Sequence, residues 1–431
     1  MHYNALFWII IALVIVSFIW DQILTALNRS RMSDTLPPEL TGIYEPEEYA
    51  RQQQYQRVNS RFGTVSAAFN TVLLLAVVAF GAAGWLDARL QRLTTHYLLL
   101  PLLFFGIIFL LVTLIGTPFD YYDTFTIEAR FGFNKSTRKL FFADALKGLL
   151  LTAVLGAVVV GAVAFFYHLT TTWFWLIAWG VLTCFSVGVN YFYSQLIVPL
   201  FNKQTPLEDG ELRDALMDLG GRAGFTISNI YLLDSSKRST KSNAYFTGFG
   251  KRKRIVLYDT LLTDLEPQEI VAVLAHEIGH YRKHHTVIGL ALGVALTGVQ
   301  LWLMSFFLGS SAAAVALGSH VAAPSFSLGL IAFSLIFAPV SELIGVAESA
   351  LSRRHEYQAD AFAAQMGLAA PLVSGLKKIS AKALSNLTPH PLVVAWEYSH
   401  PTLLQRMGHL GASQVSEAAP ADDTAAAGRG A

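Results

Sequence analysis

Seven long apolar segments constrain the fold of this 431-residue chain more than any other feature. Each approaches the roughly 20 apolar residues that a helix needs to cross the hydrocarbon core of a bilayer. The chain is 53% hydrophobic and only 14% charged, whereas soluble domains carry about 25% charged residues. The sequence therefore predicts an integral, multi-pass membrane protein, with spans near residues 5–20, 65–86, 97–115, 146–167, 172–193, 287–308 and 326–346.

The spans divide the chain into five predicted regions. Residues 1–193 hold five membrane helices and their loops, and residues 194–285 form a compact region of mixed helix and strand. Residues 286–346 hold the last two membrane helices, and 347–410 form a second polar, helical region. Residues 411–431 are rich in Ala, Gly and acidic side chains without apolar periodicity, which is typical of a disordered tail.

Lysine and arginine concentrate in alternate loops. The first loop carries Arg29, Arg31 and Arg57, and the large region 194–285 carries many more, whereas loop 309–325 has none. The positive-inside bias then places both polar regions in the cytoplasm. The alanine-rich tail and compact loops are typical of bacteria, so we expect a bacterial inner membrane. A net charge of +1 gives no basis for a nucleic-acid partner.

The segment His276-Glu277-Ile-Gly-His280 places two histidines four residues apart on a predicted helix. At that spacing both imidazoles project from one helical face, where they can bind one zinc ion. The glutamate between them is placed to take a proton from an activated water. Metzincins would have a glycine at Lys283 and a third histidine at Thr286, so that class is excluded.

A hydrolytic zinc site usually has three protein ligands, so a third is needed. Glu356 and Asp360 lie four residues apart just after the last span. One can bind zinc while the other accepts a hydrogen bond from a ligand histidine. The alternative is a solvated charged face next to Arg353 and Arg354, and the spacing leaves both interpretations open.

Three short strands are predicted ahead of the histidine helix, at 229–234, 243–250 and 254–260, with residues 250–253 as a hairpin turn. An exposed strand edge can bind an extended peptide through main-chain hydrogen bonds, although a purely structural hairpin would have the same pattern. The candidate edge residues are Asn243, Ala244 and Tyr245. Pro267 is expected to open the following helix.

Three further polar residues lie near the motif or within a span: His284, His285 and Glu342. His284 and His285 continue the histidine spacing, but three ligands on one helix would diverge along its axis, so His284 is expected at the membrane interface. Glu342 lies within the last span, where a carboxylate either faces a polar interior or makes a helix–helix hydrogen bond.

Separated blocks, in order from about residue 120 to 407, resemble the type I CAAX prenyl protease family of membrane zinc metallopeptidases. Besides the histidine motif and the block ending at Asp360, the matching segments are 125–128, 131–137, 199–203, 243–249 and 398–401 with Arg406. The resemblance implies a polytopic α-helical membrane protein. Its seven transmembrane helices would enclose a chamber, with a small α+β zinc-protease domain on the cytoplasmic side.

The resemblance also implies a role for each matching residue. One zinc ion would be bound by His276, His280 and Glu356, with Glu277 as general base and later proton donor. Asp360 would orient a ligand histidine, and His400 would stabilise the oxyanion with support from Arg406. Substrates would be peptides or proteins, possibly lipidated CAAX-type proteins cut near their C-termini, and membrane lipid would be a further partner.

Three other functions share parts of this pattern. A broader quality-control protease would have the same site, so it stays open. A site-2-type intramembrane protease needs an aspartate motif within a later span, but the Asp209-Gly210 pair lies in a polar region. A transporter with a structural zinc would lack a general base, whereas Glu277 is present.

Overall fold

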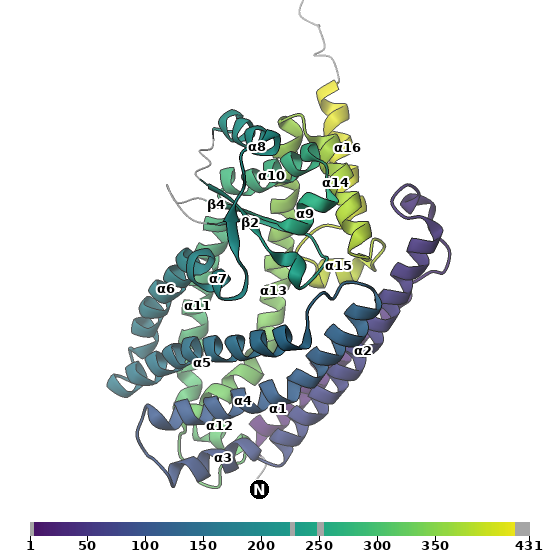
Figure 1. Cartoon of the computed structure of the whole chain (residues 1–431). Helices are drawn as coiled ribbons and strands as arrows, with labels where there is room; N and C mark the ends of the chain where they lie inside the picture. Colours follow the sequence, from purple (N-terminus) through teal and green to yellow (C-terminus); the bar gives the residue numbers. More distant parts are fainter. Residues whose placement is uncertain (1–3, 225–228, 248–253, 419–431) are drawn as a thin grey trace, which may run out of the picture.

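A computed structural model of the chain describes residues 4–224, 229–247 and 254–418 (Figure 1). Within these ranges, seven helical segments are long and apolar enough to cross a membrane. They are α1 (Ala5–Arg29), α2 (Pro46–Ala79), α4 with the π-helical turn η2 (Leu99–Glu128), α5 (Arg138–Leu169), α6 with the π-helical turn η3 and α7 (Phe174–Phe201), α11 (His285–Leu308) and α13 (Phe326–Gln365). The predicted number of spans is therefore confirmed.

Several predicted boundaries differ from the structure. The second span was expected to end at residue 86, but α2 ends at Ala79 because Gly81 adopts a left-handed φ of 62°, and the separate helix α3 (Ala82–Gln91) follows. The last predicted boundary, between 346 and 347, falls inside α13, which contains 40 residues and joins the membrane part to the polar part. Helix α16 (Leu403–Ala418) continues past the predicted start of the tail at 411, and residues 419–431 lie outside the described residues.

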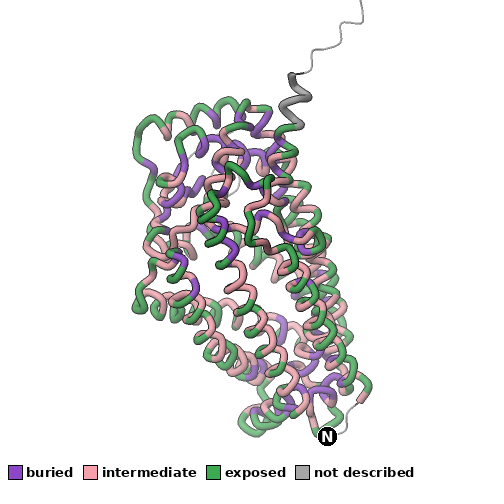
Figure 2. Tube along the Cα trace, turned by 90° about the vertical axis from the view of Figure 1, so that its right-hand side faces the viewer, coloured by how far each residue is buried: buried purple, intermediate pink, exposed green. Residues whose placement is uncertain are grey.

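The membrane helices form a loosely packed shell, whose far end is closed by a small apolar core. In each span only 6–17% of the most apolar window is buried within the protein. Figure 2 shows the buried residues gathered at the two ends, with exposed and intermediate residues between them. At the end near the N-terminus, α1 and α4 pack against α3 and α12 (Ser311–Ala316). Low burial along the spans fits helices that surround a hollow rather than a solid bundle.

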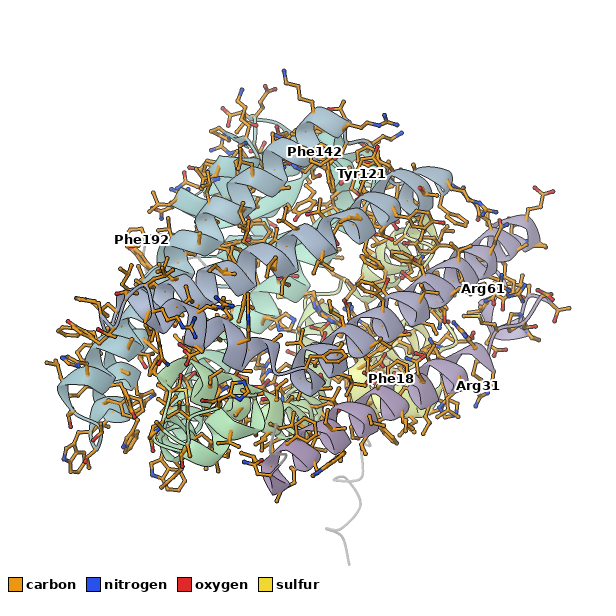
Figure 3. All side chains as sticks on the ribbon, turned by 90° about the horizontal axis from the view of Figure 1, so that it is seen from below. Phe18, Arg31, Arg61, Tyr121, Phe142 and Phe192 are labelled. Carbon is orange, nitrogen blue, oxygen red and sulfur yellow. The ribbon has the colours of Figure 1, made fainter. Side chains whose placement is uncertain are left out.

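Neighbouring membrane helices contact one another through aromatic side chains on the halves nearer the polar part. Viewed from below, Tyr121 of α4 and Phe142 of α5 point toward each other (Figure 3), and their rings stack at 6.1 Å. On the other side of the shell, α1 and α2 run side by side, where Arg29 donates to Ser60 and Thr64. These contacts hold the shell together where apolar packing is sparse.

The polar part is built on a mixed four-stranded sheet in the order β1-β2-β4-β3. Strands β2 and β4 are parallel, while β1 and β3 are each antiparallel to their neighbour. The strands are β1 (Gln204–Pro206), β2 (Asn229–Leu233), β3 (Ala244–Thr247) and β4 (Arg254–Tyr258). The three predicted strands are confirmed, and β1 was missed because it is only three residues long. The predicted turn at 250–253 lies outside the described residues.

Helices cover this sheet and enclose the main apolar core, in which Leu216, Leu219 and Leu261 are fully buried. Helix α10 runs through that core between the sheet and α13 (Figure 1). The covering elements are α8 (Glu211–Arg222), α9 (Asp259–Asp264), α10 (Pro267–Arg282), α14 (Ala369–Lys382) and α16. The short helices η1 (Pro38–Leu40), η4 (Ser235–Lys237) and α15 (Pro391–Glu397) lie at the junction with the membrane part.

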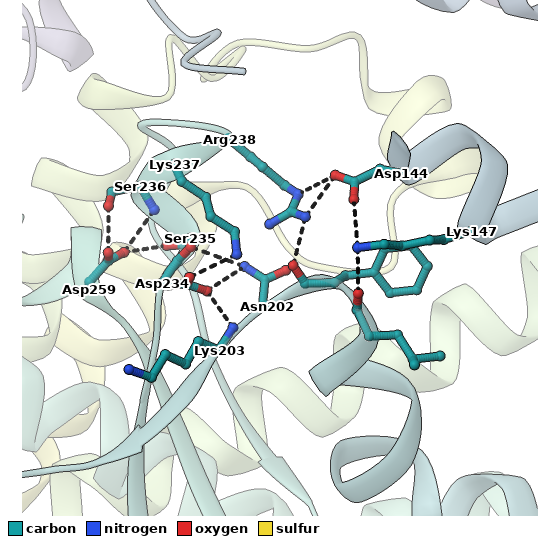
Figure 4. Close-up of polar contacts among 12 residues, drawn as sticks. Asp144, Lys147, Asn202, Lys203, Asp234, Ser235, Ser236, Lys237, Arg238 and Asp259 are labelled. Atoms are coloured by element: carbon teal, nitrogen blue, oxygen red, sulfur yellow. Dashed lines mark hydrogen bonds and ion pairs between the residues drawn. The ribbon is translucent and has the colours of Figure 1, made fainter. Parts of the chain in front are cut away.

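A polar network fastens the sheet to the membrane helices. Figure 4 shows Arg238, just after η4, bound to Asp144 of α5 and to the carbonyl of Phe201 at the end of α7. Next to it, the Asp234 carboxylate accepts hydrogen bonds from the backbone of Lys203 and the amide of Asn202. These bonds fix the segment that leads into β3.

Candidate metal centre and active site

The helix that carries both histidines begins as its sequence predicts. Pro267 is the first helical residue of α10, and Glu266 and Glu269 form a reciprocal capping box around it. Apolar residues at helical spacing, including Ile270 and Leu274, are buried in the main core. The helix is therefore held on its apolar side, and His276 and His280 face α13.

Gly279 sets the distance between α10 and α13. A Cβ atom at this position would lie 2.9 Å from Cα of Ala359 and 3.1 Å from Cβ of Phe362. Glycine lacks that atom, so the two helix backbones can approach closely. The close approach places the histidine pair opposite Glu356 and Asp360, although His276 and Glu356 are 80 residues apart in the sequence.

Three side chains from these helices converge on one point. His276 Nε2 lies 3.1 Å from His280 Nε2, and the Glu356 carboxylate lies 3.4 Å from the first and 3.2 Å from the second. One ligand atom from each residue falls within 4.8 Å of the others. Within the described residues this is the group of three that could hold a metal ion.

The donor set fits zinc. Two imidazole nitrogens and one carboxylate oxygen are common zinc ligands in hydrolytic sites. Glu356 is 4% exposed, and its Oε2 lies 3.4 Å from Nε2 of His276 and 3.5 Å from the Arg406 guanidinium. Two imidazole nitrogens and a buried carboxylate that face one another form a donor set that a cation between them would satisfy. The residues therefore match the metal that the sequence predicts.

Asp360 and Arg406 support His276 from behind. Asp360 Oδ1 lies 2.9 Å from His276 Nδ1, so the imidazole donates there and its Nε2 is free to bind a metal. Arg406, on α16, donates to both oxygens of Asp360, at 2.9 and 2.5 Å. Burial alone would lower the pKa of His276, but hydrogen bonds to Asp360 and Glu356 raise it to about 9.

The third side of the site is a cavity of about 700 Å³. Glu277 and His400 both line it beside the three donors. Burial raises the pKa of Glu277 above that of an ordinary carboxyl group, which suits a general base that works near neutral pH. His400, in the loop before α16, is largely exposed and lies 3.5 Å from Glu356 through its Nε2.

The edge strand β3 begins on the same cavity. Asn243 and Ala244 line it, and one edge of β3 pairs with β4, while no strand among the described residues pairs with its other edge. The ring of Tyr245, the third predicted edge residue, packs against that of Tyr258 on β4 at a centroid distance of 6.5 Å.

The structure gives the contacts of two further polar residues near the site. Arg406 contacts Asp360, Glu356 and His276 in the described structure, so it supports the metal donors more directly than it supports His400. Glu342 accepts a hydrogen bond from the indole of Trp396 at 2.7 Å, which is the helix–helix alternative.

Sequence reasoning gave no role to His285 and did not identify Gln358. Helix α10 ends at Arg282, so His284 does not continue the histidine face, and it is exposed like Lys283. His285 instead is buried and contacts His280 through their Nδ1 atoms at 3.0 Å. Its Nε2 contacts Gln358 Oε1 at 2.8 Å. His285 follows His280 by five residues, and residues at that spacing do not share a helical face, so the sequence offers no reason to place the two together.

Known proteins share this arrangement along nearly the whole chain. Residues 26–203 match the family described as CAAX prenyl protease N-terminal, five membrane helices, and residues 206–414 match peptidase family M48. The CAAX prenyl protease 1 homolog of Oryza sativa subsp. japonica is 33% identical over 89% of this chain and 92% of its own length. CAAX prenyl protease 1 of Saccharomyces cerevisiae is 33% identical over 91% and 92%.

A solved structure agrees with the fold. The crystal structure of S. mikatae Ste24p superposes with a TM-score of 0.89 at 32% identity, covering 95% of this chain and all of that one. The predicted fold, seven membrane helices enclosing a chamber with a mixed protease domain at one end, is thereby confirmed. By sequence and by structure, this chain belongs to the CAAX prenyl proteases of metallopeptidase family M48.

Proposed function

We propose that this metalloprotease binds one zinc ion through His276, His280 and Glu356 and cleaves peptides in the chamber beside it. The observation that carries the proposal is the convergence of these three donors on one wall of the cavity. When bound, zinc would supply Lewis-acid polarisation of the scissile carbonyl and would lower the pKa of a water molecule toward 7.

Glu277 is the proposed general base. It lies between the two histidines in sequence and faces the cavity, so its carboxylate can take the proton of the attacking water. The same carboxyl group then donates that proton to the nitrogen of the leaving amine. Burial raises the pKa of Glu277, and a higher pKa makes the carboxylate a stronger base toward the water proton.

His400 is the proposed oxyanion donor. Its Nδ1 lies 2.9 Å from the Ser399 hydroxyl, and its Nε2 points toward the metal donors. A donor in this place can stabilise negative charge that develops on the carbonyl oxygen, and loss of one such donor costs about 3 kcal/mol in hydrolases. Arg406 and Asp360 are proposed as positioning residues, since they contact the donors rather than the cavity centre.

The free edge of β3 is the proposed peptide site. A substrate that adds to the edge at Asn243 and Ala244 would bring its scissile bond toward Glu277. The relatives named above are CAAX prenyl proteases, so we propose CAAX-type proteins, cut near their C-termini, as substrates. The low burial of the shell supports a lipid-accessible path for a prenylated substrate.

The test is cleavage of a synthetic CAAX-type peptide by purified protein, with and without a prenyl group. Glu277→Gln is expected to lose activity by about 10²–10⁴-fold while it keeps one zinc per chain. Glu356→Ala is expected to lose both zinc and activity. Glu348→Gln is the matched control, since Glu348 lines the same cavity but is not one of the three donors. Full activity in Glu277→Gln would overturn the proposed base.

Substrate trapping with Glu277→Gln in cells then separates two functions. Recovery of proteins with CAAX ends supports the proposed processing, whereas recovery of diverse misfolded membrane proteins would assign a quality-control protease. A prenyl requirement is rejected if the unmodified peptide is cut equally fast.

We also propose that the active site faces the cytoplasm of a bacterial inner membrane. The support is the loop bias of lysine and arginine and the composition of the tail. Single cysteines in a Cys184→Ser background test it with an impermeant maleimide on spheroplasts. Leu93→Cys, at the opposite end of the shell, should react at once, and Glu208→Cys, in the polar part, only after lysis. Reaction of Glu208→Cys in intact spheroplasts would reverse the orientation.

A further inference from the structure

The junction between α10 and α11 has an unusual backbone. His284 adopts a left-handed φ of 60°, one of two non-glycine residues that do so in the described ranges. Few non-glycine residues adopt this conformation, and histidine is among those that do so more often, with asparagine and aspartate. With His284 in this conformation, α10 ends at Arg282 and α11 begins at His285, whose side chain contacts the metal donor His280.

His285 is held on three sides. Its Nδ1 lies 3.0 Å from Nδ1 of His280, and its Nε2 lies 2.8 Å from Oε1 of Gln358. Its ring stacks on that of His355 at a centroid distance of 3.8 Å and an angle of 6°. His285 is only 6% exposed. A buried imidazole with both nitrogens engaged has its orientation fixed.

The partners also fix where the protons are. The amide oxygen of Gln358 can only accept, so His285 donates to it from Nε2. A neutral His285 then has an unprotonated Nδ1, which accepts from Nδ1 of His280. His280 is left with its Nε2 lone pair directed at Glu356, 3.2 Å away. The opposite tautomer of His285 would put the His280 proton on Nε2, where it would block a metal.

We propose that His285 and Gln358 form a positioning pair that holds the ligand tautomer and ring orientation of His280. The inference rests on the proposed zinc site. Each ligand histidine would then have its own positioning pair, because Asp360 and Arg406 orient His276 in the same way through a charged pair. Outer partners of metal-bound histidines typically change metal affinity by about 10–100-fold when removed.

The experiment measures the zinc dissociation constant of purified protein by competition with a chromophoric chelator. The visible spectrum of the cobalt-substituted protein gives a second readout that does not depend on activity. His285→Leu is expected to weaken zinc binding by about 10–100-fold and to alter the cobalt bands. His285→Asn places an amide oxygen near the position of Nδ1, so it should restore most of the affinity.

Variants at Gln358 keep the test independent of His285. Gln358→Leu should weaken zinc binding, and Gln358→Glu, which keeps an acceptor, should not. The double variant His285→Leu/Gln358→Leu should match His285→Leu alone, since Gln358 acts only through His285. His355→Leu is the packing control, because it removes the stacked ring but leaves both hydrogen bonds.

The possible outcomes separate this inference from the proposed site. Wild-type zinc affinity in both leucine variants overturns the positioning pair, and the site stands if Glu356→Ala still loses zinc. Equal loss in His285→Leu and His285→Asn also overturns it, because the hydrogen bond would then not be the cause. If Glu356→Ala keeps its zinc, the proposed ligand set itself is wrong.

Discussion

The close approach at Gly279 gives a prediction whose size follows from the structure. In Gly279→Ala the new Cβ would lie 2.9 Å from Cα and 3.1 Å from the carbonyl oxygen of Ala359. Carbon atoms pack best at about 3.5–4.0 Å, so α10 and α13 must separate by roughly 0.6–1 Å. The contact is with backbone, and no side-chain rotation can relieve it. Metal sites hold their donor distances to about 0.2 Å, so this shift is several times what a zinc site tolerates.

Stability should change much less than metal binding. Overpacking costs about 1–3 kcal/mol, while alanine in a helix interior is favoured over glycine by about 1 kcal/mol. The net loss is therefore about 0–2 kcal/mol. A misplacement near 1 Å at a catalytic site can cost about 10²-fold in rate, and we expect a loss of that order in peptide cleavage together with weaker zinc binding.

The assay compares Gly279→Ala with Gly293→Ala in the same detergent, by zinc competition, peptide cleavage and thermal unfolding. Gly293 is in the neighbouring helix α11, and a Cβ there would meet no atom within 4 Å. It gains the same helix propensity, so it should keep its zinc affinity and activity. Wild-type zinc affinity and cleavage in Gly279→Ala would refute the argument that this glycine sets the donor geometry.

Three further predictions concern charges at the site. Arg406→Leu leaves Asp360 buried without its cation, so the free energy of unfolding should fall by about 3–5 kcal/mol. Denaturation measures this loss, with Arg406→Lys as the comparison. An unchanged stability would contradict the buried pair. Burial raises the pKa of Glu277, and the base must be deprotonated to act, so kcat/KM should fall as the pH drops through that raised pKa. The pH–rate profile measures this acid limb, and a limb at or below the ordinary carboxyl pKa of about 4.3 would contradict the prediction. In metal-free protein His276 should be protonated below its pKa of about 9. Zinc binding at pH 7 should therefore release a proton, and the zinc affinity should rise with pH up to about 9. Calorimetry in buffers of different ionisation enthalpy measures that proton, and a pH-independent affinity would contradict the prediction.

Local patterns accounted for the parts of the fold that depend on neighbours in sequence. The spans follow from apolar length, and the start of α10 follows from Pro267 and its capping box. The second span was wrong at its end because the apolar run continues across Gly81, where only a backbone turn divides it. The boundary predicted at 346 follows a change of composition, and the helix α13 continues through it.

The candidate site shows the same division. The histidine spacing defined two donors, and the resemblance named Glu356 as the third, but the spacing alone left Glu356 and Asp360 interchangeable. The structure distinguishes them, because Asp360 is fully buried against Arg406 and Nδ1 of His276, while Glu356 faces both Nε2 atoms. His285 and Gln358 had no sequence signal, since their contact depends on a left-handed residue at 284.

By itself the sequence determined a seven-span membrane protein with a zinc-binding helix and a short sheet, because apolar length, helical spacing and strand alternation act over a few turns of chain. The tertiary structure alone decided which carboxylate meets the histidines, which face of β3 opens on the cavity and which partners hold each imidazole. Those choices depend on a helix separation set by the missing side chain of Gly279, which contacts Ala359, 80 residues later in the sequence.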